Sequence, residues 1–320
     1  MQRRAIGRSN LKIAPLVLGG NVFGWTADRD ASFRTLDAFF DAGFDAVDTA
    51  DVYSNWVPGH RGGESETVIG EWLRARGQRD RVALFSKVGA KTAEGGSGLS
   101  ADHIVRSLEQ SLRRLNTDYV DLYQAHTDDT KTPLDETLVA FDRLIAAGKV
   151  RVIGASHYGA PRLIEASNVS AINGVARYNS LQPRYNLHDR AEFEGAVQKA
   201  CVALDIGALA YSALAKGFLT GKFRSGPDSA GSPYEERHNA YRDARGVRIL
   251  SAMDQVGQAH DATPAEIALA WLVAQPGVAA AITAFDTPEQ LQEVIGFTRL
   301  TLTPAEIDSL NAAGALETAP

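Results

Sequence analysis

The sequence contains very little cysteine. Cys201 is the single cysteine among 320 residues, which excludes an intramolecular disulfide and a cysteine-based zinc or iron–sulfur site. Cys201 falls in a helical pattern and is interpreted as a small core residue. The seven histidines are scattered and show no paired ligand spacing on one helix. We therefore expect no metal site.

An excess of positive charge and long apolar runs are also lacking. Lys and Arg number 33 against 39 Asp and Glu, a net charge of −6, which gives no electrostatic basis for binding nucleic acid or an anionic membrane. The longest uncharged stretch, residues 267–285, is interrupted by Gln275-Pro276-Gly277, which predicts helix, turn and buried strand. Four basic residues among the first twelve leave no secretory signal. We expect a cytoplasmic protein that acts on a small molecule, and homo-oligomer formation stays open.

Apolar runs and helical patterns alternate along the chain. The runs are too continuous for a half-exposed sheet and are typical of buried parallel strands. They occupy residues 16–18, 46–47, 82–85, 120–123, 150–153, 175–178, 208–210 and 278–282. Eight strands, each followed by a helix, predict an α/β fold: one (β/α)8 TIM barrel domain over residues 1–320, with an N-terminal β-hairpin (residues 4–6 and 11–13) and an extra C-terminal helix. A doubly wound sheet is disfavoured because Gly19, Gly20 and Gly24 do not have G-x-G-x-x-G spacing.

Three helix starts share one pattern. Thr263, Thr287 and Thr303 are each followed by Pro and, three residues on, by Glu or Gln. This spacing predicts a capping box at each helix N-terminus. The polar, Gly- and Pro-containing segment 221–241 is interpreted as a functional loop after the seventh strand.

Polar side chains stand at the ends of the predicted strands, where a barrel forms its active site. Asp48, Lys87 and His126 end three successive strands, Ser156 and His157 end the fifth, and Tyr211 ends the seventh. Each residue alone has an ordinary structural explanation. Together the three successive ends point at one central space, which favours a catalytic set.

Such a set suits the reduction of a carbonyl group. The carbonyl oxygen gains negative charge and needs a proton donor, and a tyrosine hydroxyl with a pKa of ~10 needs a nearby ammonium to become a better acid. Tyr53, on the loop after Asp48, is the candidate acid. Lys87 supplies the ammonium, Asp48 holds Lys87, and His126 positions the carbonyl oxygen.

Several motifs resemble those of the aldo-keto reductase family. They are Asp48-Thr49-Ala50-Asp51-Val52-Tyr53, Gly63-Glu64-Ser65-Glu66, Ser86-Lys87, Gln124-Ala125-His126, Gly148-Lys149-Val150-Arg151 and Ala210-Tyr211-Ser212. The resemblance runs in the same order over nearly the whole chain. It implies a barrel closed by an N-terminal hairpin, reduction of carbonyls with NADPH, and a catalytic tetrad of Asp48, Tyr53, Lys87 and His126.

The resemblance also implies where the cofactor binds. The nicotinamide ring would stack on Tyr211, its carboxamide would meet Ser156 and Gln182, and Gly20 and Asn21 would line the mouth of the first strand. The pyrophosphate would lie beneath a segment that contributes Ser212, Leu214, Gly217, Leu219 and Thr220.

Two departures from the family pattern bear on the cofactor. His157 stands where the family has Asn. The last-strand loop, which usually carries Arg or Lys for the 2′-phosphate, reads Ala284-Phe285-Asp286, with Gln290 and Glu293 retained and Val294 in the place of an Asn. Asp286 would repel a phosphate, whereas basic residues in or near segment 221–241 would compensate: Lys222, Arg224, Arg237, Arg242 and Arg245. We expect NADP(H), with NAD(H) a close alternative.

Trp25 and Trp56 follow the first two strands and are candidate walls of a substrate site that also includes Tyr53 and His126. They suggest an apolar or ring-bearing carbonyl. Two other functions stay open on the same fold. One is a non-catalytic, nicotinamide-binding regulatory subunit, and the other is an aldolase that forms a Schiff base through Lys87.

Overall fold

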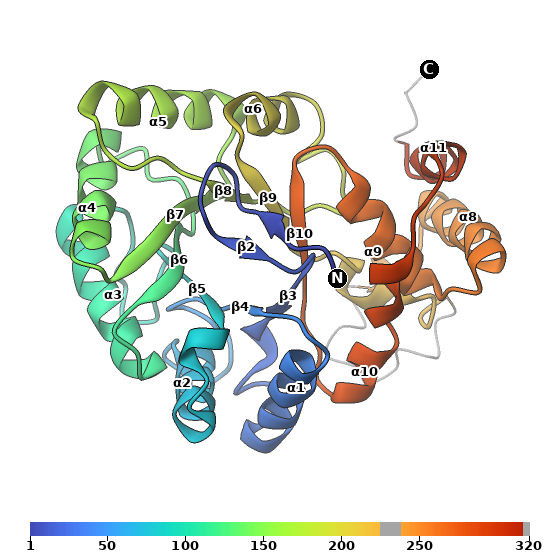
Figure 1. Cartoon of the computed structure of the whole chain (residues 1–320), viewed down its shortest axis with the longest axis horizontal. Coiled ribbons are helices and arrows are strands. Elements are labelled where there is room, and N and C mark those ends of the chain that lie inside the picture. The colour runs from blue at the N-terminus through green and yellow to red at the C-terminus, as the bar shows by residue number, and fades with distance from the viewer. Residues whose placement is uncertain (225–237, 316–320) are drawn as a thin grey trace.

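The computed structural model describes residues 1–224 and 238–315. Its centre is a closed barrel of eight parallel strands in the order β10-β3-β4-β5-β6-β7-β8-β9 (Figure 1). The strands are β3 (Leu16–Gly19), β4 (Ala46–Asp48), β5 (Ala83–Val88), β6 (Val120–Ala125), β7 (Val150–Ser156), β8 (Ser180–Gln182), β9 (Gly207–Ala210) and β10 (Val278–Thr283). The predicted barrel is confirmed.

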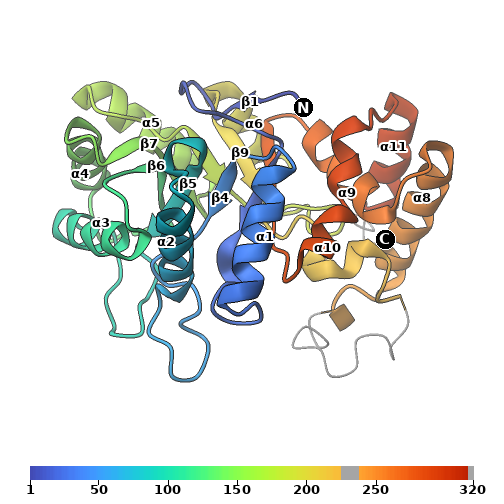
Figure 2. The same ribbon diagram turned by 60° about the horizontal axis from the view of Figure 1, so that its bottom comes forward.

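A short antiparallel hairpin closes one end of the barrel. Strands β1 (Arg4–Ala5) and β2 (Lys12–Ile13) pair in register Arg4↔Ile13. Ile6 and Ile13 are fully buried against residues of the barrel interior, among them Phe85 and Leu209. Figure 2 shows this hairpin at one end of the barrel and the long connecting loops at the other. The loops that follow the carboxyl ends of the strands therefore lie at the end of the barrel that the hairpin leaves open.

Helices surround the barrel. The α-helices are α1 (Arg29–Asp41), α2 (Glu64–Arg76), α3 (Ala101–Leu115), α4 (Leu134–Ala146), α5 (Ala160–Asn173), α6 (Ala196–Leu204), α8 (Ala244–His260), α9 (Pro264–Ala274), α10 (Pro288–Gln292) and α11 (Pro304–Ala313). Short 3₁₀ segments occur at η1 (Gly20–Val22), η2 (Arg79–Arg81), η3 (Ala215–Thr220) and η5 (Ile295–Arg299), and η3 is kinked at Lys216 and Gly217. The expected extra C-terminal helix is α11, which packs beside α8.

The sixth barrel strand is not where the apolar run predicts it. The prediction of residues 175–178 is wrong, because the strand is Ser180–Gln182. Two of its three side chains are polar and reach across the barrel interior. Ser180 Oγ donates to Gln124 Oε1 at 3.3 Å, and Gln182 Nε2 donates to Asp48 Oδ1 at 3.0 Å. A search for apolar runs misses a strand whose inward face carries hydrogen-bonding groups.

Two of the three predicted capping boxes form. Thr263 and Thr303 each accept from the backbone N–H three residues on and are bonded in return by Glu266 and Glu306. The prediction of a capping box at Thr287 is wrong, because Gln290 instead accepts from the backbone N–H of Asp286 at 2.8 Å. Of the predicted loop 221–241, residues 225–237 lie outside the described residues.

Within the described residues, no helix combines the length and the apolar character needed to cross a membrane. The same part of the chain contains no cluster of three or more His, Cys, Asp or Glu side chains suited to a metal ion.

Candidate active site

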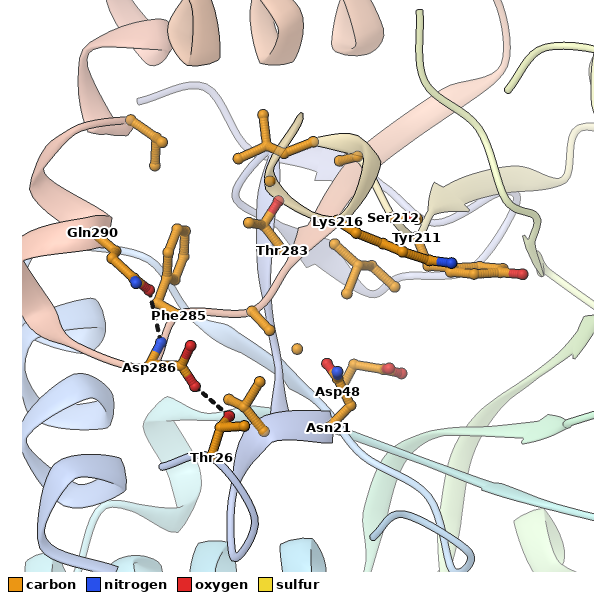
Figure 3. Close-up of a pocket in the computed structure, with 18 of the residues that line it drawn as sticks. Asn21, Thr26, Asp48, Tyr211, Ser212, Lys216, Thr283, Phe285, Asp286 and Gln290 are labelled. Carbon is orange, nitrogen blue, oxygen red and sulfur yellow. Dashed lines mark hydrogen bonds between the residues drawn. The ribbon is translucent and has the colours of Figure 1, made fainter. Parts of the chain in front are cut away.

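A pocket of about 900 Å³ opens at the carboxyl ends of the barrel strands. Asp48, Ser156, Gln182 and Thr283 are the last residues of four strands, and all four line it. Figure 3 shows the pocket with Asp48 and Tyr211 on one side and Asp286 and Gln290 on the other. We call the part around Asp48 the catalytic end. The distal end comprises Thr26, Lys222, Asp286, Gln290 and Glu293.

Lys87 is the central group of the catalytic end. Its ammonium Nζ donates to Asp48 Oδ2 at 2.7 Å, to the Thr49 carbonyl at 2.8 Å and to the Tyr53 hydroxyl at 2.7 Å. The side chain is fully buried, and its three donors have three acceptors. Desolvation lowers the pKa of Lys87, while the charge of Asp48 acts in the opposite direction. The ammonium is thus fixed between Asp48 and Tyr53.

Tyr53 holds its proton at neutral pH. Burial and then the negative charge of Asp48 raise its pKa well above 10. The Lys87 ammonium, 2.7 Å from the Tyr53 oxygen, acts in the opposite direction, because a positive charge at that distance stabilises the phenolate. Since the Tyr53 oxygen accepts from Lys87, its own proton can be directed to Asp48 Oδ2, 3.3 Å away, or into the pocket.

His126 follows β6 and lines the pocket beside Tyr53. The two rings meet edge to face, with centroids 6.0 Å apart. Burial, followed by the charges of Lys87 and His157, lowers the pKa of His126 well below 6.5. Its Nδ1 is buried and has no hydrogen-bond partner among the described residues. A neutral imidazole in this position can donate one N–H to an oxygen atom bound next to Tyr53.

A second buried polar cluster lies behind the tetrad. Glu66 of α2 accepts from Ser86 Oγ at 2.6 Å and from Arg114 Nε at 2.7 Å. Asp51, on the loop that carries Tyr53, is also buried, but neither of its carboxylate oxygens has a partner among the described residues. Burial, reinforced by Glu66, raises the pKa of Asp51 to about 8. Asp51 is therefore protonated at neutral pH.

Tyr211, Ser156, His157 and Gln182 form the wall opposite the distal end. The ring of His157 meets that of Tyr211 edge to face at 5.6 Å, and His157 Nδ1 lies 3.4 Å from Glu192. Ser156 Oγ donates to the Gln182 carbonyl at 2.8 Å. The Gln182 amide reaches Asp48, so this wall is bonded directly to the tetrad.

The segment after Tyr211 has an unusual backbone. Ser212, Ala215, Lys216 and Gly217 all have positive φ, at 57°, 49°, 56° and 96°. The Ser212 carbonyl is held by Asn186 Nδ2 at 2.9 Å. The N–H groups of Ala215 and Gly217 donate within the loop, to the carbonyls of Ser212 and Leu214. A backbone that mixes left- and right-handed residues can turn its remaining N–H groups toward an anion such as a pyrophosphate.

At the distal end, two side-chain pairs connect neighbouring loops. The Asp286 carboxylate accepts from the Thr26 hydroxyl, and its backbone N–H donates to Gln290 (Figure 3). Lys222 Nζ lies 2.6 and 2.5 Å from the two carboxylate oxygens of Glu293. The pocket at this end is thus bounded by loops that follow β3, β9 and β10.

Most residues singled out from the sequence line this pocket. They are Asn21, Asp48, Tyr53, His126, Ser156, His157, Gln182, Tyr211, Ser212, Leu214, Gly217, Thr220, Asp286 and Gln290. Lys87 lies beneath it and Leu219 is buried in the core. Gly20 also lies outside the lining, where a Cβ would approach Ser65 Oγ to 2.8 Å, so its glycine serves packing. Trp25 and Trp56 lie outside the lining and pack on each other edge to face at 5.7 Å.

Sequence reasoning missed several lining residues, among them Thr26, Phe223, Thr283 and Phe285. Thr283 could have been found, because it is the last residue of a strand like Asp48 and Ser156. Thr26 gives no such signal, since its position depends on how the loop after β3 meets the loop after β10.

The pocket fits a dinucleotide cofactor. Its volume is near the upper end of the ~300–1,000 Å³ usual for ligand sites. Thr283 Oγ1 and His126 Nδ1 are buried polar atoms of its lining without a partner among the described residues. Such atoms usually have a partner in the working protein. An aromatic ring for stacking and an anion-binding loop lie next to each other at Tyr211 and Ser212.

Comparisons with known proteins agree with the fold. Residues 15–315 match the model of the aldo/keto reductase family. The uncharacterized oxidoreductase YrpG of Bacillus subtilis is 33% identical over 319 residues, covering 97% of this chain and 95% of YrpG. The aldo-keto reductase YhdN of the same organism is 30% identical, over 96% and 90% of the two chains. A putative voltage-gated potassium channel subunit beta of Schizosaccharomyces pombe is 31% identical, over 91% and 86%.

Fold and site together define a (β/α)8 barrel protein with a Lys-centred polar set at the carboxyl ends of its strands. The chain belongs to the aldo/keto reductase family. Membership supports an oxidoreductase activity that uses NAD(P)H.

Proposed function

We propose that the protein is an NAD(P)H-dependent carbonyl reductase, which converts an aldehyde or ketone into an alcohol or catalyses the reverse reaction. The observation that carries this proposal is the position of Lys87 Nζ, 2.7 Å from both Asp48 and Tyr53 at the floor of the pocket. A protonated tyrosine beside a fixed ammonium is suited to donating a proton to an oxygen that gains negative charge.

The tetrad residues have separate roles in this reaction. A reduced nicotinamide dinucleotide, when bound, supplies a hydride to the carbonyl carbon. Tyr53 gives its hydroxyl proton to the carbonyl oxygen, so that the C=O group becomes CH–OH. Lys87 stabilises the negative charge left on the Tyr53 oxygen, and Asp48 keeps Lys87 charged and in place. In the reverse direction Tyr53 accepts the proton of the alcohol.

We propose that His126 and two tryptophans position the substrate. The neutral His126 donates to the carbonyl oxygen. Trp56 is 46% exposed and meets the Tyr53 ring at 6.1 Å, with Trp25 packed behind it. This row of rings, which meet edge to face, provides apolar surface next to the proton donor and favours an apolar or ring-bearing carbonyl.

The cofactor residues follow from the same arrangement. Tyr211 would stack on the nicotinamide ring, and Ser156, His157 and Gln182 would contact its carboxamide. The backbone of segment 212–220 would hold the pyrophosphate, and Asn21 would line the edge near Asp48. The distal end is left for the adenosine half. The choice between NADP(H), which the sequence favours narrowly, and NAD(H) depends on the charges there.

Replacing the Tyr53 hydroxyl tests the proposal. Tyr53→Phe should lower turnover of simple aldehydes by ~10²–10⁴-fold, because it removes the proton donor. Binding of the reduced cofactor, measured by fluorescence titration, should change little. Tyr158→Phe is the matched control, since that hydroxyl is buried against Tyr178 on the outer side of the barrel. Normal turnover by Tyr53→Phe would refute the assignment of the acid.

Two other functions are less well supported. One relative is named a putative potassium channel subunit beta, so a regulatory role is the second candidate. The complete tetrad favours catalysis, because a regulatory subunit that only binds the cofactor does not need it. Consumption of NADH or NADPH with an aldehyde panel separates the two. A Schiff-base aldolase is disfavoured, because Lys87 Nζ is buried and donates to three acceptors. A nucleophilic lysine must instead be neutral and accessible.

A further inference from the structure

The distal end of the pocket carries more negative than positive charge. Asp286 and Glu293 both line it, and Lys222 is paired with both oxygens of Glu293. His238 lines the adjoining wall, and burial lowers its pKa, so it adds no positive charge at neutral pH. Lys216 also lines the pocket, but Figure 3 draws it on the side of Asp48 and Tyr211 and not on the side of Asp286 and Gln290.

The cations that were expected to compensate Asp286 are engaged elsewhere. Arg224 makes a bidentate ion pair with Asp254, with both contacts at 2.6 Å. Arg245 donates to the ring of His188 at 3.0 Å. Arg242 donates to the Phe223 carbonyl at 3.0 Å and to Asn239 at 2.5 Å. Arg237 lies outside the described residues. Among the residues described, Lys222 is therefore the cation of the distal end, and Glu293 already balances it.

Asp286 is held as a hydrogen-bond acceptor. The Thr26 hydroxyl donates to Oδ1, and the Asp286 backbone N–H donates to Gln290 at 2.8 Å. In the described part of the chain no hydrogen bond reaches Oδ2, and the residue is half-buried in the pocket wall. A carboxylate fixed in this way suits hydroxyl donors and disfavours a second anion.

The two nicotinamide dinucleotides differ at one place in the adenosine half. NAD(H) carries a ribose 2′-hydroxyl where NADP(H) carries a phosphate monoester. Acidic side chains accept from the ribose hydroxyl, whereas a phosphate needs an arginine or a similar cation. With the nicotinamide at Tyr53 and Tyr211, the adenosine half extends toward Asp286 and Glu293.

We propose that Asp286 is a specificity-determining residue, which accepts from the adenosine ribose hydroxyls and excludes a 2′-phosphate, so that the protein uses NAD(H) in preference to NADP(H). This inference rests on the proposed function only in that the pocket binds a nicotinamide dinucleotide. It reverses the narrow preference for NADP(H) drawn from the sequence, because among the described residues Lys222 and Arg224 are ion-paired, and Arg242 and Arg245 donate to groups other than Asp286.

Direct binding measurements test the inference without turnover. Dissociation constants for NADH and NADPH are measured by fluorescence titration of the whole chain at fixed ionic strength. The unaltered protein should bind NADH at least ~10-fold more tightly, since a like-charge contact costs at least that factor in affinity. Asp286→Asn should reduce the difference in affinity between NADH and NADPH, and Asp286→Arg should make NADPH the tighter ligand.

The control is Asp308→Arg, which makes the same change of charge at an exposed position of α11. It should leave the ratio of the two dissociation constants unchanged. Equal or tighter binding of NADPH by the unaltered protein, or an unchanged ratio in Asp286→Arg, would overturn the inference while leaving the proposed reductase function intact. Failure to bind either dinucleotide would instead contradict the proposed function.

Discussion

The two ends of the pocket are built differently. At the catalytic end, Asp48 and Lys87 are contributed by strands, are fully buried and bond to each other, and each bonds to at least one further residue. At the distal end, Asp286, Thr26 and Lys222 lie on loops, are partly exposed and meet in single pairs. Strand ends are fixed by the barrel register, so the catalytic groups have little freedom. Loop residues can change without disturbing the barrel, and specificity is therefore expected to vary there.

The largest effect should come from removing the ammonium that organises the catalytic end. Lys87→Met should lower turnover by ~10²–10⁴-fold, because nothing then stabilises charge on the Tyr53 oxygen or balances Asp48. Steady-state consumption of the reduced cofactor measures the change. Cofactor binding reports whether the pocket is intact.

Lys149→Met provides the matched control. Lys149 is partly exposed and pairs with Glu109 on the outside of the barrel, so the variant should turn over normally. If turnover by Lys87→Met stayed within tenfold of that of the unaltered protein, the catalytic end would not depend on this buried ammonium, and the contrast with the distal end would be wrong.

A smaller effect concerns stability near the catalytic end. The pKa of Asp51 is about 8 in the folded state, against ~4 when unfolded. The folded state thus holds an extra proton between these values, so stability is fully present below about pH 4 and is lost as pH rises toward 8. Asp51→Asn should remove this loss, so its gain in the free energy of unfolding should be greater at pH 9 than at pH 6 by on the order of 3 kcal/mol.

Urea denaturation at pH 6 and pH 9 checks this prediction. The stability gained from Asp51→Asn should be greater at pH 9 than at pH 6. Asp118→Asn, a change of the same kind at an exposed site, should give no pH-dependent difference. An equal gain at both pH values would mean that Asp51 does not titrate in this range.

The smallest effect should come from the support of Asp286. Thr26→Val keeps the shape of the side chain but removes the donor to Asp286. The carboxylate is then less well positioned, so NADH affinity should fall a few-fold, roughly the ~1 kcal/mol of one hydrogen bond. Fluorescence titration with NADH measures it. Thr132→Val, which loses a donor to the distant Asp129, should leave NADH affinity unchanged. An equal loss of NADH affinity in both variants would mean that Thr26 has no specific role in cofactor binding.

The sequence predicted that Asp48, Lys87 and His126 lie together at one end of the barrel, and their catalytic role stays a prediction. Each stands within one residue of a strand end, and parallel strands in a barrel bring such ends together. β8 was missed because its inward residues, Ser180 and Gln182, are polar and bond across the interior. The helix start at Thr287 was predicted correctly, but its capping box was not, because Gln290 accepts from the Asp286 backbone instead.

The sequence by itself determined the barrel, its hairpin and the residue types of the catalytic end, since these depend on periodicity and on position along each strand. Only the tertiary structure decided how the charges act. It placed Asp48 and a dry interior against Tyr53, which raise its pKa. It also paired Lys222 with Glu293 and Arg224 with Asp254. The energy of a charge depends on its neighbours and its burial, and neither is encoded at a fixed sequence spacing.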